Sequence, residues 1–367
     1  MNVLVTGSNG FIGKNLVVRL NELGINVITY TRKNSIQDLP DLIKKSDFIF
    51  HLAGENRPID KKDFDAVNAG LTASICESIR SLGKKIPILL ASSIQAKSDN
   101  AYGRSKLRAE MVIRELESEM GSFVYIYRLP GVFGKWCKSN YNSVIATYCH
   151  NISHNLPIQI SDPSFELNLV YIDDVVEEFV RVMQENQDNK KELSVQPEYS
   201  IKLGDVASQI ECFRKSRDSL VSERVGDDFI SKLYSTYVSY FSPEQFSYSI
   251  PSYADERGMF AEMLKTKDSG QISFFTAKPG VTRGGHYHNS KTEKFLVIQG
   301  NARFGFRHVV SDEIHEIITN SKDLKIVETI PGWSHDITNI GNAEMVVMLW
   351  ANEIFDPDNP DTITYKV

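Results

Sequence analysis

The sequence has few cysteines and lacks the features that mark several classes of protein. Its four cysteines, Cys76, Cys137, Cys149 and Cys212, are widely spaced and form no CxxC pair. They fit free thiols in a reducing compartment better than a disulfide framework. The net charge of −6, without any Lys/Arg run, argues against a nucleic-acid partner.

No uninterrupted apolar run is long enough to cross a bilayer, so we expect no membrane partner. The first five residues already read as a β-strand and leave no room for a signal peptide, so the sequence predicts a cytoplasmic protein.

What is present is the composition of a folded protein with more than one core. Apolar residues make up 41% and charged residues 24% of the 367 residues, and a chain of this length favours two domains. The pattern changes from helical to short alternating strands near Pro243. We therefore predict domains at 1–243 and 244–367.

The first domain opens with the stretch "NVLVTGSNGFIGKNLVVRLNELG", an apolar strand, a glycine-rich turn and a helical pattern. Gly7 permits the tight turn, Gly10 lets the backbone approach a pyrophosphate, and Gly13 allows close packing of helix on strand. The helix N-terminus adds partial positive charge. Because the glycines stand in a strand–turn–helix context, they predict dinucleotide binding.

The second strand, "INVITYT", ends at Arg32 and Lys33. An NAD site usually has an acidic residue here for the ribose 2′-hydroxyl, whereas two cations suit a 2′-phosphate. The pair predicts NADPH as the cofactor, with an ordinary solvated pair at a strand end as the alternative. Further alternation of strands and helices predicts an α/β Rossmann-type parallel sheet.

Tyr102 and Lys106, in "AYGRSKLRAEMV", are four residues apart and share one face of a predicted helix. A tyrosine hydroxyl has a pKa near 10 and needs a nearby cation to exchange protons at neutral pH. Lys106 is positioned to be that cation. Ser92 and Ser93 end the strand before this helix, and eight residues separate Ser93 from Tyr102.

These motifs, with "HLAG", "VNAG", "YRLPGVFG" and "LVYIDDVVEEF", resemble the nucleotide-sugar branch of the extended short-chain dehydrogenase/reductases over roughly residues 1–240. The resemblance implies that Tyr102 transfers the proton, that Lys106 holds the ribose and tunes Tyr102, and that Ser93 (or Ser92) orients the substrate oxygen. It also implies cofactor contacts at Phe11, Ile12, Leu52 and Ala53. The segment "SFELN" lacks the arginine that commonly meets the substrate phosphates; Arg57, Lys135 and Lys138 are the substitutes we consider.

The second domain contains short strands with glycine turns, which predict an all-β sandwich or barrel. His286 and His288 alternate on one strand and therefore point to one face. With Glu293 and His335 they make a plausible set for one divalent metal such as zinc, the alternative being a metal-free polar cluster. Their spacing resembles the first cupin motif, and Gly332, His335 and Asn339 resemble the second.

"DERGMFAEM" and "TRGGHYH" are also similar to segments of the deoxysugar 3,5-epimerases, which are cupins. That similarity implies that Asp255, Arg257, Arg283 and His286 line a substrate pocket. His286 would be the proton-abstracting base there but a metal ligand here, so the base stays unassigned.

Over the full chain, the combination resembles a family of bifunctional capsular-polysaccharide enzymes. The resemblance implies a cupin that epimerises C3 of a UDP-2-acetamido-2,6-dideoxy-4-keto-hexose. It also implies a first domain that reduces C4 with NADPH to UDP-N-acetyl-6-deoxy-L-talosamine, on the route to UDP-N-acetyl-L-fucosamine, in a homodimer. One alternative is a single-activity 4-keto-sugar reductase with a structural, dimerising cupin. The other is a non-catalytic NADP-sensing module, against which the Tyr102–Lys106 pair counts because binding alone requires no acid–base pair.

Overall fold

The computed structural model describes the chain from Met1 to Val367 except residues 57–59, 61–63, 186–192, 227, 247, 289–290, 310, 324, 331 and 359. Arg57, considered above for substrate phosphates, lies outside the described residues. The chain divides into two compact units. Unit 1 contains Met1–Ile210 and Lys232–Phe241, and unit 2 contains Glu211–Ser231 and Ser242–Val367.

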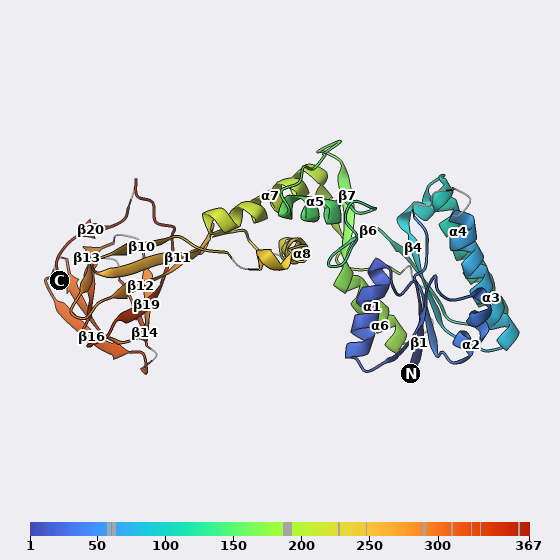
Figure 1. Ribbon diagram of the computed structural model, residues 1–367, viewed down its shortest axis with the longest axis horizontal. Helices are drawn as coiled ribbons and strands as arrows, with labels where there is room; N and C mark the ends of the chain where they lie inside the picture. The colour runs from blue at the N-terminus through green and yellow to red at the C-terminus, as the bar shows by residue number, and fades with distance from the viewer. Residues whose placement is uncertain are drawn as a thin grey trace. The chain divides into compact units, whose positions relative to one another are not determined.

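The centre of unit 1 is a five-stranded sheet in the order β2-β1-β3-β4-β5, with every pairing parallel (Figure 1). Parallel strands are covered on both faces and therefore read as near-continuous apolar runs. The sequence "FIFH" of β3, buried at every position, is such a run. The strands are β1 (Asn2–Thr6), β2 (Asn26–Tyr30), β3 (Phe48–His51), β4 (Ile88–Ser93) and β5 (Val124–Leu129).

Helices cover both faces of this sheet, with α1 and α6 on one side and α2, α3 and α4 on the other (Figure 1). In α1, Leu16 and Leu20 are buried one turn apart and pack on the sheet. The predicted Rossmann-type α/β fold is confirmed. The helices are α1 (Phe11–Glu22), α2 (Leu39–Lys44), α3 (Leu71–Leu82), α4 (Ala101–Met120) and α6 (Ile172–Glu185).

Further elements precede β10 in the chain. Strands β6, β7 and β8 form a small sheet of their own. Among the residues that the structure describes, no helix is long and apolar enough to cross a membrane. The elements are β6 (Gly131–Phe133), α5 (Val144–Ser153), β7 (Glu166–Tyr171), β8 (Tyr199–Lys202), α7 (Leu203–Ser219), β9 (Val221–Ser222), α8 (Asp228–Val238), a π-helical turn (Asp65–Gly70) and 3-10 turns at Ile36–Asp38, Ile94–Lys97 and Pro243–Gln245.

Unit 2 contains two sheets that enclose one apolar core, which includes Phe275, Phe295, Phe304 and Val347. One runs β10-β11-β12-β19-β14-β17, with β9 paired parallel to β11; the other runs β16-β15-β18-β13-β20. The predicted all-β second domain is confirmed. The strands are β10 (Ser252–Asp255), β11 (Gly258–Thr266), β12 (Gly270–Ala277), β13 (Thr282–Tyr287), β14 (Glu293–Gln299), β15 (Asn301–His308), β16 (Ile314–Asn320), β17 (Ile326–Glu328), β18 (Trp333–Asn339), β19 (Met345–Ala351) and β20 (Ile363–Thr364).

The chain enters unit 2 twice, because residues 211–231 also belong to it and β9 pairs with β11. The domain limits of 1–243 and 244–367 therefore stay a prediction about which segments fold independently.

Candidate functional site

The glycine-rich turn lies where the strand order reverses, between the carboxyl ends of β1 and β3. Gly7 follows β1 with a φ of +69°, and a Cβ there would lie 2.7 Å from the Ala53 nitrogen and 3.0 Å from the Leu52 carbonyl carbon. A Cβ on Gly13 would lie 2.2 Å from the Gly7 oxygen. Only glycine fits these close approaches. Ligands of open α/β sheets bind at this kind of reversal point.

Helix α1 begins at this turn, with Gly10 as its N-cap and Phe11 and Ile12 as its first residues. The Gly10 N–H donates to the Gly7 oxygen at 2.8 Å, which closes the turn. The first N–H groups of a helix have no partner within it and attract anions. All seven cofactor residues predicted at Gly7–Gly13 and at Leu52–Ala53 therefore gather at one edge of the sheet.

Arg32 follows β2 at the same edge and contacts a residue that the sequence did not indicate. Its Nη2 lies 2.7 Å from Glu55 Oε2, and Tyr141 donates to Glu55 Oε1 at 3.2 Å. The Arg32 side chain is 87% exposed, so this ion pair is worth at most about 1 kcal/mol. Arg32 can therefore leave Glu55 for a phosphate, and Lys33 beside it is exposed.

Tyr102, Lys106 and Ser93 lie together at the start of α4. The side chain of Asn100 caps this helix by accepting from the Gly103 N–H at 2.8 Å. Lys106 Nζ lies 6.0 Å from the centre of the Tyr102 ring, and Ser93 hydrogen-bonds the Tyr102 hydroxyl. The three predicted catalytic residues thus share one place in unit 1.

The short segment between Ser93 and Tyr102 does not separate them. It forms the 3-10 turn Ile94–Lys97, and a Cβ on Gly103 would lie 2.2 Å from the Gln95 oxygen. Glycine at position 103 therefore lets the first turn of α4 approach the backbone that follows β4.

Burial determines the protonation states of Tyr102 and Lys106. Burial raises the pKa of Tyr102, and the hydrogen bond with Ser93 opposes that shift. Burial lowers the pKa of Lys106 to about 8, although the negative charge of Glu110 opposes it. The expected lowering of the Tyr102 pKa is not seen in the chain alone. The phenol is protonated at neutral pH, which suits a proton donor.

The neighbouring serine, Ser92, is committed to another contact. Its hydroxyl donates to Glu110 Oε1 at 2.5 Å, and Arg128 Nη2 lies 2.6 Å from Glu110 Oε2. The Glu110 side chain is only 2% exposed. Of the two serines, Ser93 is the one placed to orient a substrate oxygen. Sequence reasoning missed Glu110, although it lies one turn after Lys106 on the same helix.

A buried hydrogen-bond network lies in unit 1 as well, and it includes residues of the "HLAG" and "VNAG" segments. His51 bridges the hydroxyls of Thr6 and Thr72 at 2.8 Å each, and Asn68 Oδ1 accepts from the Glu55 N–H at 2.8 Å. Burial and the charge of Lys106 lower the pKa of His51 to about 3. His51 is therefore neutral and fixes β1 and β3 to α3.

In unit 2, the four predicted metal ligands meet at one place. His286 lies on β13, His288 directly after it, Glu293 starts β14, and His335 lies on β18 opposite His286. One ligand atom from each residue lies within 4.8 Å of the others. Glu293 Oε2 is 3.2 Å from His288 Nε2 and 3.4 Å from His335 Nε2.

The charge states of these four side chains, and the ring nitrogens that lack a hydrogen-bond partner among the described residues, suit a divalent metal. Burial, together with repulsion from His335 and His288, lowers the pKa of His286 to about 4, so its imidazole is neutral at pH 7. Burial raises the pKa of Glu293, but its close contacts with His288 and His335 and the charge of Lys291 together lower it more, and the carboxylate is ionised. Neither ring nitrogen of buried His335 makes a hydrogen bond within the described chain. Neutral imidazoles with one carboxylate are a donor set that zinc accepts.

The residues similar to those of deoxysugar epimerases lie in unit 2 as well. Asp255 pairs with Arg257 at 2.5 Å. Arg283, three residues before His286, donates to the Thr276 oxygen at 3.1 Å and lies 5.2 Å from the centre of the Phe275 ring. In unit 1, Lys135 pairs with Asp173, and Lys138 lies 5.0 Å from the Tyr141 ring.

Comparison with known proteins places this geometry in a family. The NAD dependent epimerase/dehydratase family matches residues 3–196, and the polysaccharide biosynthesis C-terminal domain matches residues 253–363. The chain is 55% identical to the UDP-2-acetamido-2,6-beta-L-arabino-hexul-4-ose reductase of Pseudomonas aeruginosa, over 100% of this chain and 99% of that protein. The capsular polysaccharide assembling protein CapF of Staphylococcus aureus has a solved structure with a TM-score of 0.93 and 41% identity, covering 100% of both chains.

The chain belongs to the CapF family. This confirms the resemblance read from the sequence. A UDP-glucose 4-epimerase of Thermotoga maritima matches with a TM-score of 0.57 and 18% identity, over 65% of this chain and 98% of that one. That second similarity shows only the fold of the first domain. The family assignment rests on the relatives that match over the full length.

Proposed function

We propose that this CapF-family chain reduces the C4 ketone of a UDP-linked 4-keto-6-deoxy-N-acetylhexosamine with NADPH in unit 1 and epimerises C3 of the same sugar in unit 2. The observation that carries the reductase half is a protonated Tyr102 hydroxyl, bonded to Ser93 and beside Lys106, on a dinucleotide-binding fold. The name of the Pseudomonas aeruginosa relative, a hexul-4-ose reductase, supports the same reaction.

In the reduction, the chain's own residues supply the proton and the orientation. NADPH, when bound, supplies the hydride to C4. Tyr102 donates its proton to the C4 oxygen as the carbonyl becomes an alcohol, and the Ser93 hydroxyl holds that oxygen. The positive charge of Lys106 stabilises the tyrosinate that remains.

In the epimerisation, the C4 ketone acidifies the C3 proton. Removing that proton and returning one to the opposite face inverts C3, and later reduction of the ketone prevents the reverse reaction. His286, His288, Glu293 and His335 would hold a divalent metal, which supplies Lewis-acid stabilisation of the enediolate oxygen. Asp255, Arg257 and Arg283 are proposed substrate contacts, and the base stays unassigned.

The substrate's detail rests on the likeness to the family. We propose UDP-N-acetyl-6-deoxy-L-talosamine as the product, on the route to UDP-N-acetyl-L-fucosamine for capsule polysaccharide, with both reactions in the cytoplasm. Incubating the full chain with NADPH and UDP-4-keto sugars, followed by NMR of the product, tests this. Reduction without inversion at C3 would contradict the epimerase half and favour a single-activity 4-keto-sugar reductase. Binding of NADPH without turnover would contradict both activities and favour the non-catalytic NADP-sensing module.

We expect NADPH to be used in preference to NADH, because Arg32 and Lys33 place two cations at the cofactor edge. Replacing both by glutamine should reduce that preference by about tenfold to a hundredfold, since a hydrogen bond to a charged group contributes about 1.5–3 kcal/mol. Steady-state kinetics with each cofactor measures the ratio. A matched control is Lys44→Gln with Lys45→Gln, two cations at the C-terminal end of α2. Equal use of both cofactors by the unmodified chain would contradict the assignment.

Reduction should decline as pH rises through about 8, because burial places the pKa of Lys106 there and its charge is then lost. Glu110 raises that pKa, so Glu110→Gln should move the decline toward lower pH, by about one unit. The pH profile of kcat measures the shift, and Glu117→Gln on the same helix is the control. An unchanged profile in Glu110→Gln would show that Glu110 does not influence Lys106.

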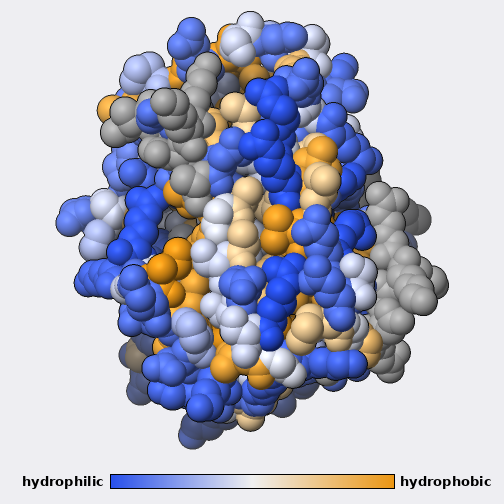
Figure 2. Space-filling view, turned by 90° about the vertical axis from the view of Figure 1, so that its right-hand side faces the viewer, coloured by the Kyte–Doolittle hydropathy of each residue, from blue (hydrophilic) through white to orange (hydrophobic). Residues whose placement is uncertain are grey.

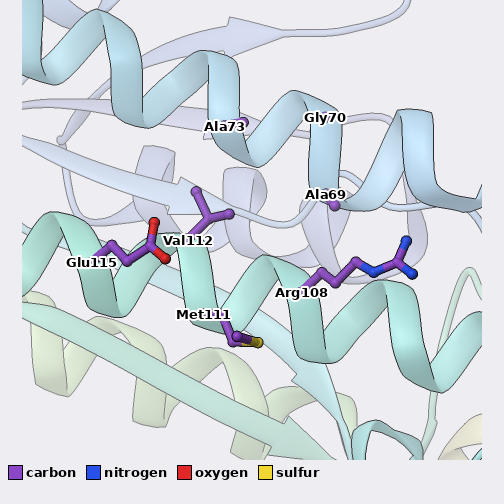
Figure 3. A pocket seen from close by; sticks show the side chains of 7 residues that line it. All are labelled: Ala69, Gly70, Ala73, Arg108, Met111, Val112 and Glu115. Atoms are coloured by element: carbon purple, nitrogen blue, oxygen red, sulfur yellow. The ribbon is translucent and has the colours of Figure 1, made fainter.

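Two copies of the chain are proposed to pair through α3 and α4. A hollow of about 390 Å³ lies there, and Figure 3 shows Met111 and Val112 between Arg108 at one end and Glu115 at the other. Met111 is 55% exposed. Figure 2 looks at this side and shows apolar side chains grouped between hydrophilic ones. A two-fold axis near Met111 would set Arg108 of one copy against Glu115 of the other, so the surface is self-complementary.

Met111→Glu should convert this dimer to a monomer, because it would place a carboxylate at the centre of the pairing surface. Analytical ultracentrifugation of the full chain measures the mass. Ile36→Glu, an exposed position 52% accessible elsewhere in unit 1, is the control. A monomeric wild type, or a dimer that Met111→Glu leaves intact, would refute the surface.

A further inference from the structure

The C-terminal segment pairs with the strand that carries His286, the first of the four proposed metal ligands. β20 pairs antiparallel with β13, with Thr364 opposite His286 and Ile363 opposite Tyr287. The Tyr365 N–H donates to the Gly285 oxygen at 3.0 Å. β13 therefore lies between β18, which carries His335, and β20, which carries no ligand.

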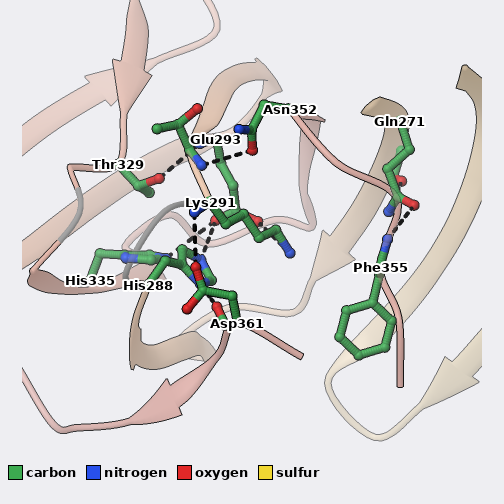
Figure 4. A network of polar contacts seen from close by, with 11 residues as sticks. Gln271, His288, Lys291, Glu293, Thr329, His335, Asn352, Phe355 and Asp361 are labelled. Carbon is green, nitrogen blue, oxygen red and sulfur yellow. Dashed lines mark hydrogen bonds and ion pairs between the residues drawn. The ribbon is translucent and has the colours of Figure 1, made fainter. Parts of the chain in front are cut away.

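Asp361, just before β20, makes two contacts with the loop that joins β13 to β14. Its backbone oxygen accepts from His288 Nδ1, and its carboxylate oxygen Oδ2 accepts from the Lys291 N–H at 2.9 Å (Figure 4). His288 and Lys291 lie on either side of the loop's centre, and Glu293 follows. One residue thus holds the loop at two points.

The contact with His288 determines which nitrogen faces the cluster. A carbonyl oxygen only accepts, so Nδ1 carries the proton and Nε2 keeps its lone pair. His288 Nε2 is the atom that lies 3.2 Å from Glu293 Oε2, on the side of the other ligands. A histidine whose second nitrogen is bonded to a carbonyl has its tautomer and ring orientation fixed for metal binding.

We propose that Asp361 is a positioning residue for the metal centre: its carbonyl sets the tautomer and angle of the His288 ring, and its carboxylate holds that carbonyl in place through Lys291. The proposal rests on the metal site proposed above. It assigns a role to the C-terminal segment, which contributes no metal ligand to the cluster.

A further hydrogen bond anchors this segment to β18. The Ser334 hydroxyl donates to the Tyr365 oxygen, and Ser334 adjoins His335 on β18. Buried Lys291 also places its Nζ 3.7 Å from Glu293 Oε1 and 5.5 Å from the centre of the Phe355 ring. The segment is therefore fixed to β18 as well as to the β13–β14 loop, so a change at Asp361 alters the His288 contact rather than freeing the chain end.

The test is the affinity of the full-length chain for Zn²⁺, measured by competition with a chromophoric chelator. Asp361→Ala should weaken Zn²⁺ binding by about tenfold to a hundredfold, the usual effect of removing a group that orients a ligand. Asp361→Asn should keep most of the affinity, because its amide oxygen still accepts from the Lys291 N–H. Asp358→Ala, an exposed aspartate in the same segment, is the matched control.

The melting temperature of the metal-free protein separates positioning from folding: we expect Asp361→Ala and Asp358→Ala to melt alike without metal and to differ in Zn²⁺ affinity. If Asp361→Ala does not fold, Ser334→Ala is the variant to test. It removes the hydrogen bond from Ser334 to Tyr365 that holds the C-terminal segment, and it should also weaken Zn²⁺ binding. Wild-type affinity in the folded Asp361→Ala chain, or in Ser334→Ala if that is the variant tested, would overturn the role of Asp361 alone. A wild type that binds no Zn²⁺ would overturn the metal site and this role together.

Discussion

Tyr102→Phe is expected to abolish NADPH-dependent ketone reduction while leaving cofactor binding nearly intact. The variant loses the hydroxyl that donates the proton, and general acid catalysis of this kind contributes about 10²–10⁴ in rate. The ring itself remains, with its contact to Phe64 at 5.7 Å between centroids. Oxidation of NADPH measures turnover, and fluorescence titration measures binding.

Tyr148→Phe is the matched control, because the same hydroxyl is removed from a buried tyrosine that bonds the Gln159 oxygen elsewhere in unit 1. It should reduce the ketone at the wild-type rate. Wild-type turnover in Tyr102→Phe would sink the reductase assignment and favour the NADP-sensing alternative.

His288→Ala is expected to abolish exchange of the C3 proton of the keto sugar with solvent deuterium. The assay omits NADPH, so reduction cannot remove the ketone. Elemental analysis should find about one divalent ion per wild-type chain and clearly less in the variant, because one of four ligands is missing. The melting temperature of the metal-loaded chain should fall as well, since metal binding couples to folding.

Two other variants make this result specific. His315→Ala removes an exposed histidine from the same unit and should bind metal and exchange normally. Tyr102→Phe should also exchange normally, because its hydroxyl serves the reduction. A wild type that binds metal without catalysing exchange would make the site structural and the epimerase half of the proposal wrong.

The two sites differ in how far the sequence indicates them. His286, His288 and Glu293 stand close together in the chain, so their alternation on one strand is readable. His335 is named through its likeness to a cupin motif, and the pairing of β13 with β18 is what brings it opposite His286. Glu55, Glu110 and Asp361 carry no such signal. Each is an acidic residue whose role depends on a partner distant in sequence.

By itself, the sequence determined the strand–turn–helix at Gly7, the spacing of Tyr102 and Lys106, and the change to short strands after Pro243. These features are local, and residues within one turn or one strand have a fixed relation that spacing encodes. Only the tertiary structure shows that Ser92 donates to Glu110 while Ser93 contacts Tyr102. It alone also shows that burial keeps the phenol of Tyr102 protonated. It also decided that Asp361 holds His288. Burial and contacts across 73 residues of chain exist only once the sheets have assembled, because solvent exclusion and long-range pairing are properties of the packed fold.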